Sequence, residues 1–188
     1  MRSQDQISSG GNPFFTVGHS NRSIEEFIQI LNDANIGVVT DARRLPGSRT
    51  YPQFNGDRLA SSLTEVQIAY EHVPPLGGRR GTAGGVPFDA NGAWRNKSFH
   101  DYSDYALSEG LRGGFDHLTE LGMERRCAII CCEPVWWRCH RRLILDRPLA
   151  RGRTRVLPEG QGRIEPGTPA PDAVFRDGGT VIYPATAV

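Results

Sequence analysis

Short apolar runs alternate with amphipathic segments along most of the chain. Residues 14–17 and 38–43 are rich in aromatic and β-branched side chains and end at glycine or polar residues, so each run predicts a strand. Between them, Ser23 and Glu26 form a capping-box pattern and apolar side chains then recur at helical spacing, which predicts a helix over 24–34. A strand, a helix and a strand in this order predict a parallel βαβ unit.

The alternation continues as far as residue 157. The pattern predicts helices over 58–65, 101–107, 114–121 and 139–149 and strands over 68–73, 126–132 and 154–157. The run over 126–132 is apolar after its first residue, as expected of a central strand that is buried on both faces of a parallel sheet. The predicted fold class is therefore α/β, a Rossmann-like three-layer domain with a mostly parallel sheet.

Changes in composition divide the chain into three segments. Residues 1–12 are polar and predict a disordered lead-in, and residues 13–158 carry the whole α/β pattern and predict a single domain. Residues 159–188 are rich in glycine, proline and charge, and predict a C-terminal extension with a β-hairpin over 173–183. A glycine- and proline-rich loop over 74–92 is long for a compact domain, and such loops are usually functional or mobile.

Composition and charge narrow the class of protein. The chain has 188 residues and a formal net charge of +1, so no global field argues for nucleic acid. Lys97 is the only lysine, and arginine suits bidentate phosphate binding, although a GC-rich genome gives the same bias. The sequence contains no apolar run of about 18 residues, so no membrane span is predicted. The four cysteines gather within 127–139, unlike a disulfide framework, which predicts thiols in a cytoplasmic protein.

Polar residues gather directly after three of the predicted parallel strands. Ligands of open α/β sheets bind outside the carboxyl ends of the strands, so the three groups predict one shared site. These groups are Gly18, His19, Ser20, Asn21 and Arg22, then Asp41, Arg43 and Arg44, and finally Cys132, Glu133, Arg138, Cys139, His140 and Arg141.

Four of these residues carry groups that suit catalysis. Cys132 ends a predicted strand just before a helix, where helix amides and nearby arginines lower a thiol pKa, so it is the candidate nucleophile. Glu133 or Asp41 is the candidate general base, with His19 or His140 as its polar partner. A buried structural cysteine and an ordinary Glu133–Arg141 ion pair are the alternatives. The predicted substrate-binding residues are Ser20, Asn21, Arg22, Arg43, Arg44, Arg80, His140 and Arg141.

No cofactor is predicted from these residues. If a soft metal such as zinc or iron binds, the candidate ligands are Cys132, Cys139 and His140. Their spacing matches no standard zinc pattern, and a closed structural site needs a fourth ligand.

The motifs, taken in chain order, resemble the bacterial family catalogued as domain of unknown function 488. The resemblance covers about residues 14–157 and departs near residue 157, where a histidine is expected and this chain has Leu157-Pro158. It implies a Rossmann-type α/β domain whose polar residues lie at the strand ends. The motifs that carry it are TVGHSNR at 16–22, DARR at 41–44, PGS at 46–48, PQFN at 52–55, LGGRR at 76–80, CE at 132–133 and CHRR at 139–142.

The leading functional hypothesis is an enzyme that acts on an anionic, phosphate-bearing substrate, with a nucleotide or modified nucleic acid as the favoured class. Hydrolysis or group transfer is favoured over redox chemistry. The expected partner is thus a small anionic substrate or a nucleic acid. Two alternatives stay open, which are a non-catalytic thiol- or metal-binding sensor module and a nucleic-acid-binding accessory protein.

Overall fold

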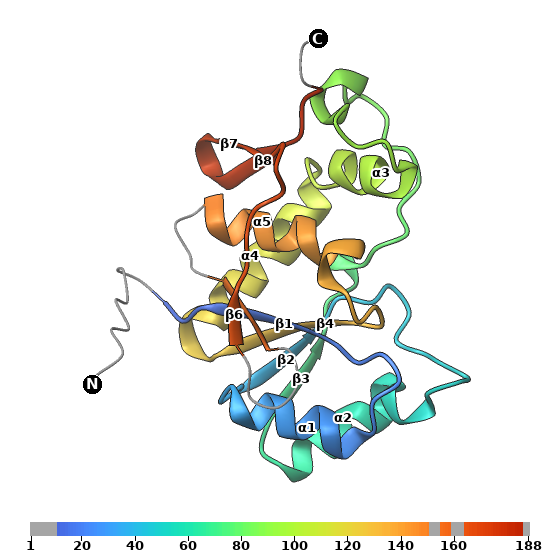
Figure 1. The fold of residues 1–188 in the computed structure, drawn as a ribbon, viewed down its shortest axis with the longest axis vertical. Helices are drawn as coiled ribbons and strands as arrows, with labels where there is room; N and C mark the ends of the chain where they lie inside the picture. The colour runs from blue at the N-terminus through green and yellow to red at the C-terminus, as the bar shows by residue number, and fades with distance from the viewer. Residues whose placement is uncertain (1–10, 151–154, 159–163, 186–188) are drawn as a thin grey trace.

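The structure, a computed structural model, describes residues 11–150, 155–158 and 164–185. Most of the lead-in predicted over 1–12 lies outside the described residues. The described part forms a sheet with helices on both faces, and a small hairpin lies beyond the helices of one face (Figure 1). This arrangement confirms the predicted three-layer α/β fold.

The main sheet has six strands in the order β3-β2-β4-β1-β5-β6. The first five are parallel to one another, and β6 pairs antiparallel with β5. Their bounds are β1 Phe14–Gly18, β2 Val38–Asp41, β3 Ala69–His72, β4 Cys127–Cys131, β5 Arg155–Pro158 and β6 Ile164–Pro166. The carboxyl ends of β1 to β4 therefore lie along one edge of the sheet, which we call the carboxyl edge.

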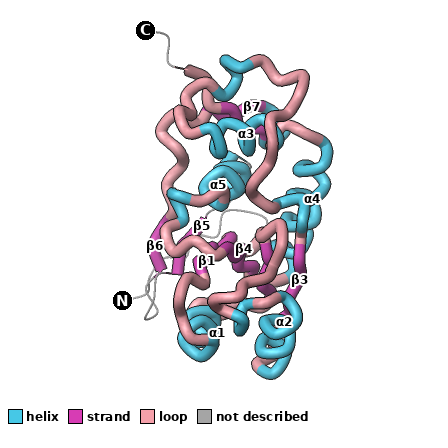
Figure 2. Tube along the Cα trace, turned by 90° about the vertical axis from the view of Figure 1, so that its right-hand side faces the viewer, coloured by secondary structure: helices cyan, strands magenta, loops and turns pink. Residues whose placement is uncertain are grey.

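Five α-helices form the two outer layers. The two helices α1 and α2 cover one face and α3 to α5 lie on the other, as the side view shows (Figure 2). The helix bounds are α1 Ile24–Asp33, α2 Gly56–Glu65, α3 Lys97–Tyr105, α4 Glu109–Glu124 and α5 Arg141–Ala150. The predicted capping box is present, because Ser23 Oγ accepts from the Glu26 amide at 3.1 Å and Glu26 Oε2 accepts from the Ser23 amide at 2.9 Å.

Alternate residues of β1, β2 and β4 fill two apolar cores. Phe15 and Ile130 face the α1–α2 layer, whereas Phe14 and Ile129 face the layer of α4 and α5. Cys127 belongs to the second core, and burial raises the pKa of its thiol to about 12. Cys127 is therefore a buried structural residue.

The predicted hairpin is present as β7 Val174–Arg176 and β8 Thr180–Ile182. The segment around it packs on α5, where Asp146 is fully buried. Asp146 accepts from Tyr183 Oη at 2.9 Å and from the Ala170 amide at 3.2 Å. The end of the described chain is thus joined to the helix that follows β4. Among the described residues, no helix is long and apolar enough to cross a membrane.

Candidate functional site

Chain topology places a switch point between β1 and β4. These strands are neighbours, yet the chain leaves β1 toward α1 on one face and leaves β4 toward α5 on the other. Ligand sites of open α/β sheets lie where the connections diverge in this way. The carboxyl edge at β1, β2 and β4 is therefore the place to look for chemistry.

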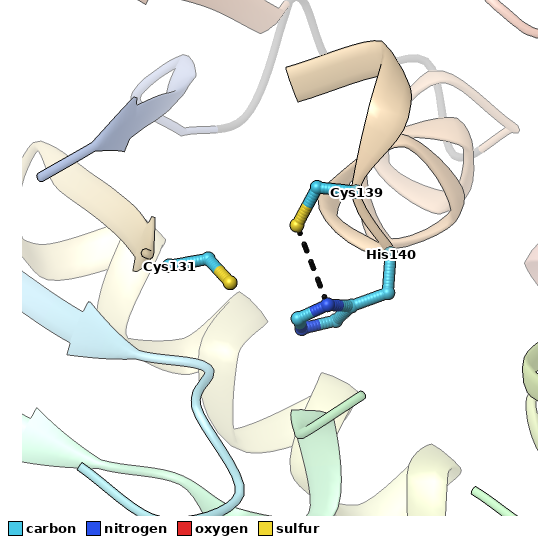
Figure 3. Close-up of side chains that lie close together, drawn as sticks. All are labelled: Cys131, Cys139 and His140. Carbon is cyan, nitrogen blue, oxygen red and sulfur yellow. Dashed lines mark hydrogen bonds between the residues drawn. The ribbon is translucent and has the colours of Figure 1, made fainter. Parts of the chain in front are cut away.

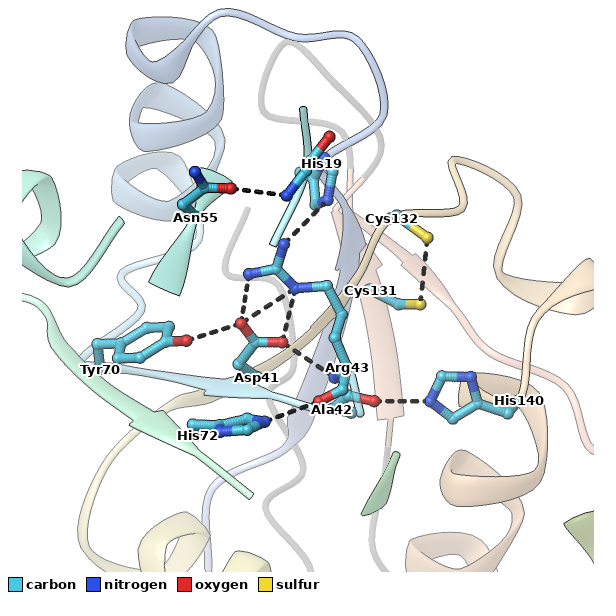
Figure 4. Close-up of polar contacts among 11 residues, drawn as sticks. His19, Asp41, Ala42, Arg43, Asn55, Tyr70, His72, Cys131, Cys132 and His140 are labelled. Atoms are coloured by element: carbon cyan, nitrogen blue, oxygen red, sulfur yellow. Dashed lines mark hydrogen bonds and ion pairs between the residues drawn. The ribbon is translucent and has the colours of Figure 1, made fainter. Parts of the chain in front are cut away.

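A buried ion pair lies at the end of β2 (Figure 4). Asp41 Oδ2 accepts from Arg43 Nη2 at 2.5 Å, and Asp41 Oδ1 accepts from Arg43 Nε at 2.9 Å and from its amide at 3.0 Å. Tyr70 Oη also donates to Asp41 Oδ2, at 2.8 Å. A carboxylate offers about four lone-pair directions, so protein groups already occupy those of Asp41. This geometry suits a support for the site better than an open general base.

His19 adjoins this pair as a neutral imidazole. Burial lowers its pKa to about 4, and the neighbouring Arg43 acts in the same direction. Its Nδ1 lies 3.0 Å from the Ser20 carbonyl and therefore donates, which leaves Nε2 to accept from Arg43 Nη1 at 3.4 Å. The ring stacks on Phe54 at 4.3 Å between centroids. These contacts hold the His19 ring in place next to the Asp41–Arg43 ion pair.

Two residues of β3 join the network, and neither was predicted from the sequence. Tyr70 binds Asp41, and His72 Nε2 donates to the Arg43 carbonyl at 2.8 Å. Burial raises the pKa of Tyr70, with the Asp41 charge as the next cause. Both residues lie beside β2 through the parallel register, in which Asp41 is opposite His72. That register was the missing signal, since it cannot be read from a single short strand.

A second group brings two thiols and an imidazole together (Figure 3). The Sγ atoms of Cys131 and Cys139 and Nδ1 of His140 all lie within 4.8 Å of one another. Cys131 ends β4, and the other two residues directly precede α5, because that helix begins two residues later than predicted. We call these three residues the thiol–imidazole cluster. Within the described ranges it is the one group of three metal-ligating side chains found.

The structure corrects the role expected for Cys132. Cys131, not Cys132, faces Cys139 and His140, because successive side chains at the end of β4 point to opposite sides. Cys132 is exposed, and its pKa is raised, chiefly by its contact with Cys131 at 4.0 Å. The expected lowering of the Cys132 pKa is therefore wrong.

Cys139 is the thiol whose environment favours ionisation. Its pKa is lowered to about 7, first by a hydrogen bond from Cys131 and then by the charge and amide of Arg141, against the effect of burial. The residue lies at the N-terminal end of α5, where the Arg142 amide donates to its carbonyl. An environment that lowers a thiol pKa was predicted for Cys132. The structure places it seven residues later, at Cys139.

Two of the arginines predicted to bind substrate hold their own loops instead. Arg22 donates to the Gly18 carbonyl and closes the turn after β1. Arg80 donates to three carbonyls of 74–77 and stacks over the Tyr105 ring at 4.1 Å. Their guanidinium groups fix the conformations of the edge loops.

Arg141 and Arg44 also have protein partners. Arg141 is buried, and it donates to Thr16 Oγ1 at 2.9 Å and to the carbonyl, not the carboxylate, of Glu133. This arrangement differs from the Glu133–Arg141 ion pair considered from the sequence. Arg44 is exposed and donates from Nη1 to the Arg79 carbonyl at 3.1 Å, so part of its guanidinium still faces solvent.

The turn after β1 packs directly against the loop after β4. The Ser20 amide donates to the Cys132 carbonyl at 3.1 Å, and Ser20 Oγ lies 3.3 Å from Asn21 Oδ1. A Cβ on Gly18 would lie 2.0 Å from the Glu133 carbonyl oxygen, so the backbones can approach this closely only at glycine. Glu133 itself is exposed.

Positive charge is concentrated at the carboxyl edge. The segments that follow β1 to β4, residues 19–23, 42–55, 73–87 and 132–140, contain seven arginines and one acidic residue, Glu133. This is a formal surplus of six positive charges, whereas the whole chain carries +1. A near-neutral protein therefore presents a locally cationic edge.

The two neighbouring tryptophans of the loop after β4 have different environments. Trp136 belongs to the core beneath α5, and Trp137 is 49 % exposed. Their rings meet edge to face at 5.8 Å between centroids. One ring anchors the loop and the other leaves an aromatic surface in solvent.

Fold and site together define an α/β protein of the doubly wound kind with a thiol–imidazole cluster at a cationic carboxyl edge. The family model described as Domain of unknown function DUF488 matches residues 23–147, and the chain belongs to this family. Neither a curated protein nor a solved structure matches the chain. The family assignment confirms the resemblance noted in the sequence and assigns no activity.

Proposed function

We propose that this protein is an enzyme that acts on a small anionic, phosphate-bearing substrate at the carboxyl edge. The thiol–imidazole cluster is its reacting centre, and hydrolysis or group transfer is its reaction class. One observation carries the proposal, which is the position of two thiols and an imidazole beside four segments with a surplus of six positive charges. Such a field concentrates anions where the reactive side chains lie.

The residues that meet the substrate differ from those first expected. Arg43 and Arg141 are buried and bonded to the protein, so neither offers free hydrogen-bond donors. Asp41 balances the charge of Arg43, whereas Arg141 still contributes a positive charge. Arg44, Arg79 and Arg138 lie exposed in the edge segments. The solvent-facing parts of their guanidinium groups suit contacts with phosphate oxygens.

The half-exposed Trp137 supports a substrate that also has a planar ring. It lies next to Arg138 in the loop that leads to Cys139. Nucleobases stack on exposed aromatic side chains, and such stacking contributes about 1–3 kcal/mol per base. A nucleotide, or a nucleotide of a modified nucleic acid, combines this ring with the phosphate that the arginines favour.

Equilibrium binding of inorganic phosphate and nucleoside monophosphates tests the substrate class. The double variant Arg44→Ala/Arg138→Ala is expected to weaken binding about tenfold, equivalent to ~1.4 kcal/mol. Arg112→Ala, which removes an exposed arginine of α4, is the matched control and should leave affinity unchanged. Binding should also weaken as salt is added. Equal losses in both variants, or no binding at all, would rule out the proposed substrate class.

Turnover of the best-bound compound tests the reacting centre. Cys139→Ser should lower turnover at least about 100-fold while substrate affinity changes little, because the lost group belongs to the chemistry. Cys132→Ser is the matched control and should retain turnover. An active Cys139→Ser variant would show that the cluster is not the reacting centre.

The same cluster favours one second candidate, a non-catalytic metal- or thiol-sensing module. Two thiols and an imidazole within 4.8 Å suit this role without any substrate. Metal binding by the intact chain, with no turnover of any phosphate compound tested, would favour the sensor over the enzyme.

A further inference from the structure

We infer that Cys131, Cys139 and His140 bind a soft divalent metal ion of the zinc type, with its fourth coordination position open. Thiolate and imidazole groups are the ligands that zinc prefers, and sites with three protein ligands are the catalytic kind. The inference replaces Cys132 of the sequence-based set with Cys131.

The orientation of His140 is that of a metal ligand. Its Nε2 lies 2.9 Å from the Ala42 carbonyl and therefore donates to it. Nδ1 is then left with its lone pair, 3.4 Å from Cys139 Sγ (Figure 3). Metal-binding histidines usually donate their other nitrogen to a carbonyl or carboxylate in this way.

The separations fit a tetrahedral ion with little movement. Bond lengths of about 2.3 Å to sulfur and about 2.0–2.1 Å to nitrogen place neighbouring ligand atoms roughly 3.5–3.8 Å apart at tetrahedral angles. The Cys139–His140 pair is at 3.4 Å, and no pair exceeds 4.8 Å. Since no pair exceeds 4.8 Å, a shift of about 1 Å or less in a ligand atom is enough to reach these separations.

Gly78 leaves space beside Nδ1 of His140, the nitrogen that would bind the metal. A Cβ on Gly78 would lie 2.7 Å from His140 Nδ1 and 3.0 Å from Cγ. Any larger residue at this position would displace the imidazole or fill the approach to its lone pair. Gly78 belongs to the glycine-rich loop over 74–92, and this contact gives that loop a defined task at the cluster.

The surrounding charge favours an anion at the open position. Two thiolates neutralise a divalent ion, and the buried Arg141 adds one positive charge. Among the residues that the structure describes, Arg141 has no carboxylate partner; its bonds go to Thr16 Oγ1 and the Glu133 carbonyl. One anionic oxygen at the fourth position would balance this charge. That this oxygen comes from the substrate rests on the proposed function, whereas metal binding does not.

Cobalt substitution of the full-length, reduced, metal-free protein tests the site without an activity assay. We expect one Co²⁺ per chain, thiolate-to-cobalt charge-transfer absorption, and displacement by Zn²⁺. Cys131→Ser, His140→Ala and Gly78→Ala should each weaken binding at least about tenfold. Cys132→Ser and Gly81→Ala are the matched controls and should bind as the unaltered chain does, since a Cβ on Gly81 meets nothing within 4 Å. Far-UV circular dichroism checks that each variant is folded.

The outcomes separate this inference from the proposed function. No charge-transfer absorption, or loss of binding in Cys132→Ser with retention in Cys131→Ser, would overturn the metal site. If the protein binds a metal but not inorganic phosphate, the metal site is supported and the proposed anionic substrate is wrong. If the affinity for phosphate is the same with and without Zn²⁺, a substrate oxygen does not occupy the fourth coordination position.

Discussion

Replacing Asp41 with alanine is expected to lower the free energy of unfolding by about 3–5 kcal/mol. The carboxylate is fully buried and has one partner in Arg43, itself 7 % exposed, and another in Tyr70. Without Asp41, the Arg43 guanidinium is a buried charge beside two neutral groups, the His19 nitrogen at 3.4 Å and the Tyr70 hydroxyl. Urea denaturation at neutral pH measures the loss.

Asp57→Ala is the control for this prediction. Asp57 is exposed in the first turn of α2, where an acidic side chain contributes only about 0.3–1 kcal/mol through the helix dipole. If Asp41→Ala costs no more than Asp57→Ala, the buried ion pair does not hold the end of β2. Tyr70→Phe should lie between them at about 1 kcal/mol, because it removes a single hydrogen bond.

Replacing Gly18 with alanine is expected to cost about 3 kcal/mol and to disturb the cluster. The added Cβ would lie 2.0 Å from the Glu133 carbonyl oxygen and 2.8 Å from Pro134 Cα, and backbone atoms cannot rotate away. Relief requires the end of β1 to separate from the loop that carries Cys139. Urea denaturation reports the stability, and cobalt binding reports the cluster.

Gly47→Ala is the matched control for Gly18. A Cβ on Gly47 meets nothing within 4 Å, so this variant should unfold at the same urea concentration as the unaltered chain. A Gly18→Ala variant that matches Gly47→Ala in stability would contradict the close backbone approach at the carboxyl edge.

The regular part of the fold is predictable from the sequence because local signals agree with the tertiary structure. The capping box at Ser23 and the apolar spacing behind it define α1 without any tertiary contact. The apolar run of β4 indicates a strand buried on both faces, and it lies at the centre of the sheet. In contrast, the helix predicted over 114–121 is too short, because the four glycines within Glu109–Glu124 lower the helix propensity of the segment.

The site was only partly predictable because it depends on where a strand ends and which side each residue faces. The sequence indicates a thiol site after β4, but a change of one residue selects Cys131 instead of Cys132. Tyr70 joins the site through a parallel register, which has no signal in a single chain of short strands. The arginines are at the predicted positions, but their hydrogen bonds to backbone carbonyls follow from tertiary contacts.

The measurement that tests the account most directly is the uptake of phenylarsine oxide, a trivalent arsenical that binds two closely spaced thiols. Intact-mass spectrometry of the reduced, metal-free protein counts bound arsenic in the unaltered chain and in three single cysteine variants. We predict one arsenical per chain, retained in Cys132→Ser and lost in Cys131→Ser and in Cys139→Ser, because Cys131 and Cys139 face each other across the site. Retention in Cys139→Ser, or loss in Cys132→Ser, would mean that the neighbouring pair Cys131–Cys132 binds the arsenical and would contradict the cluster.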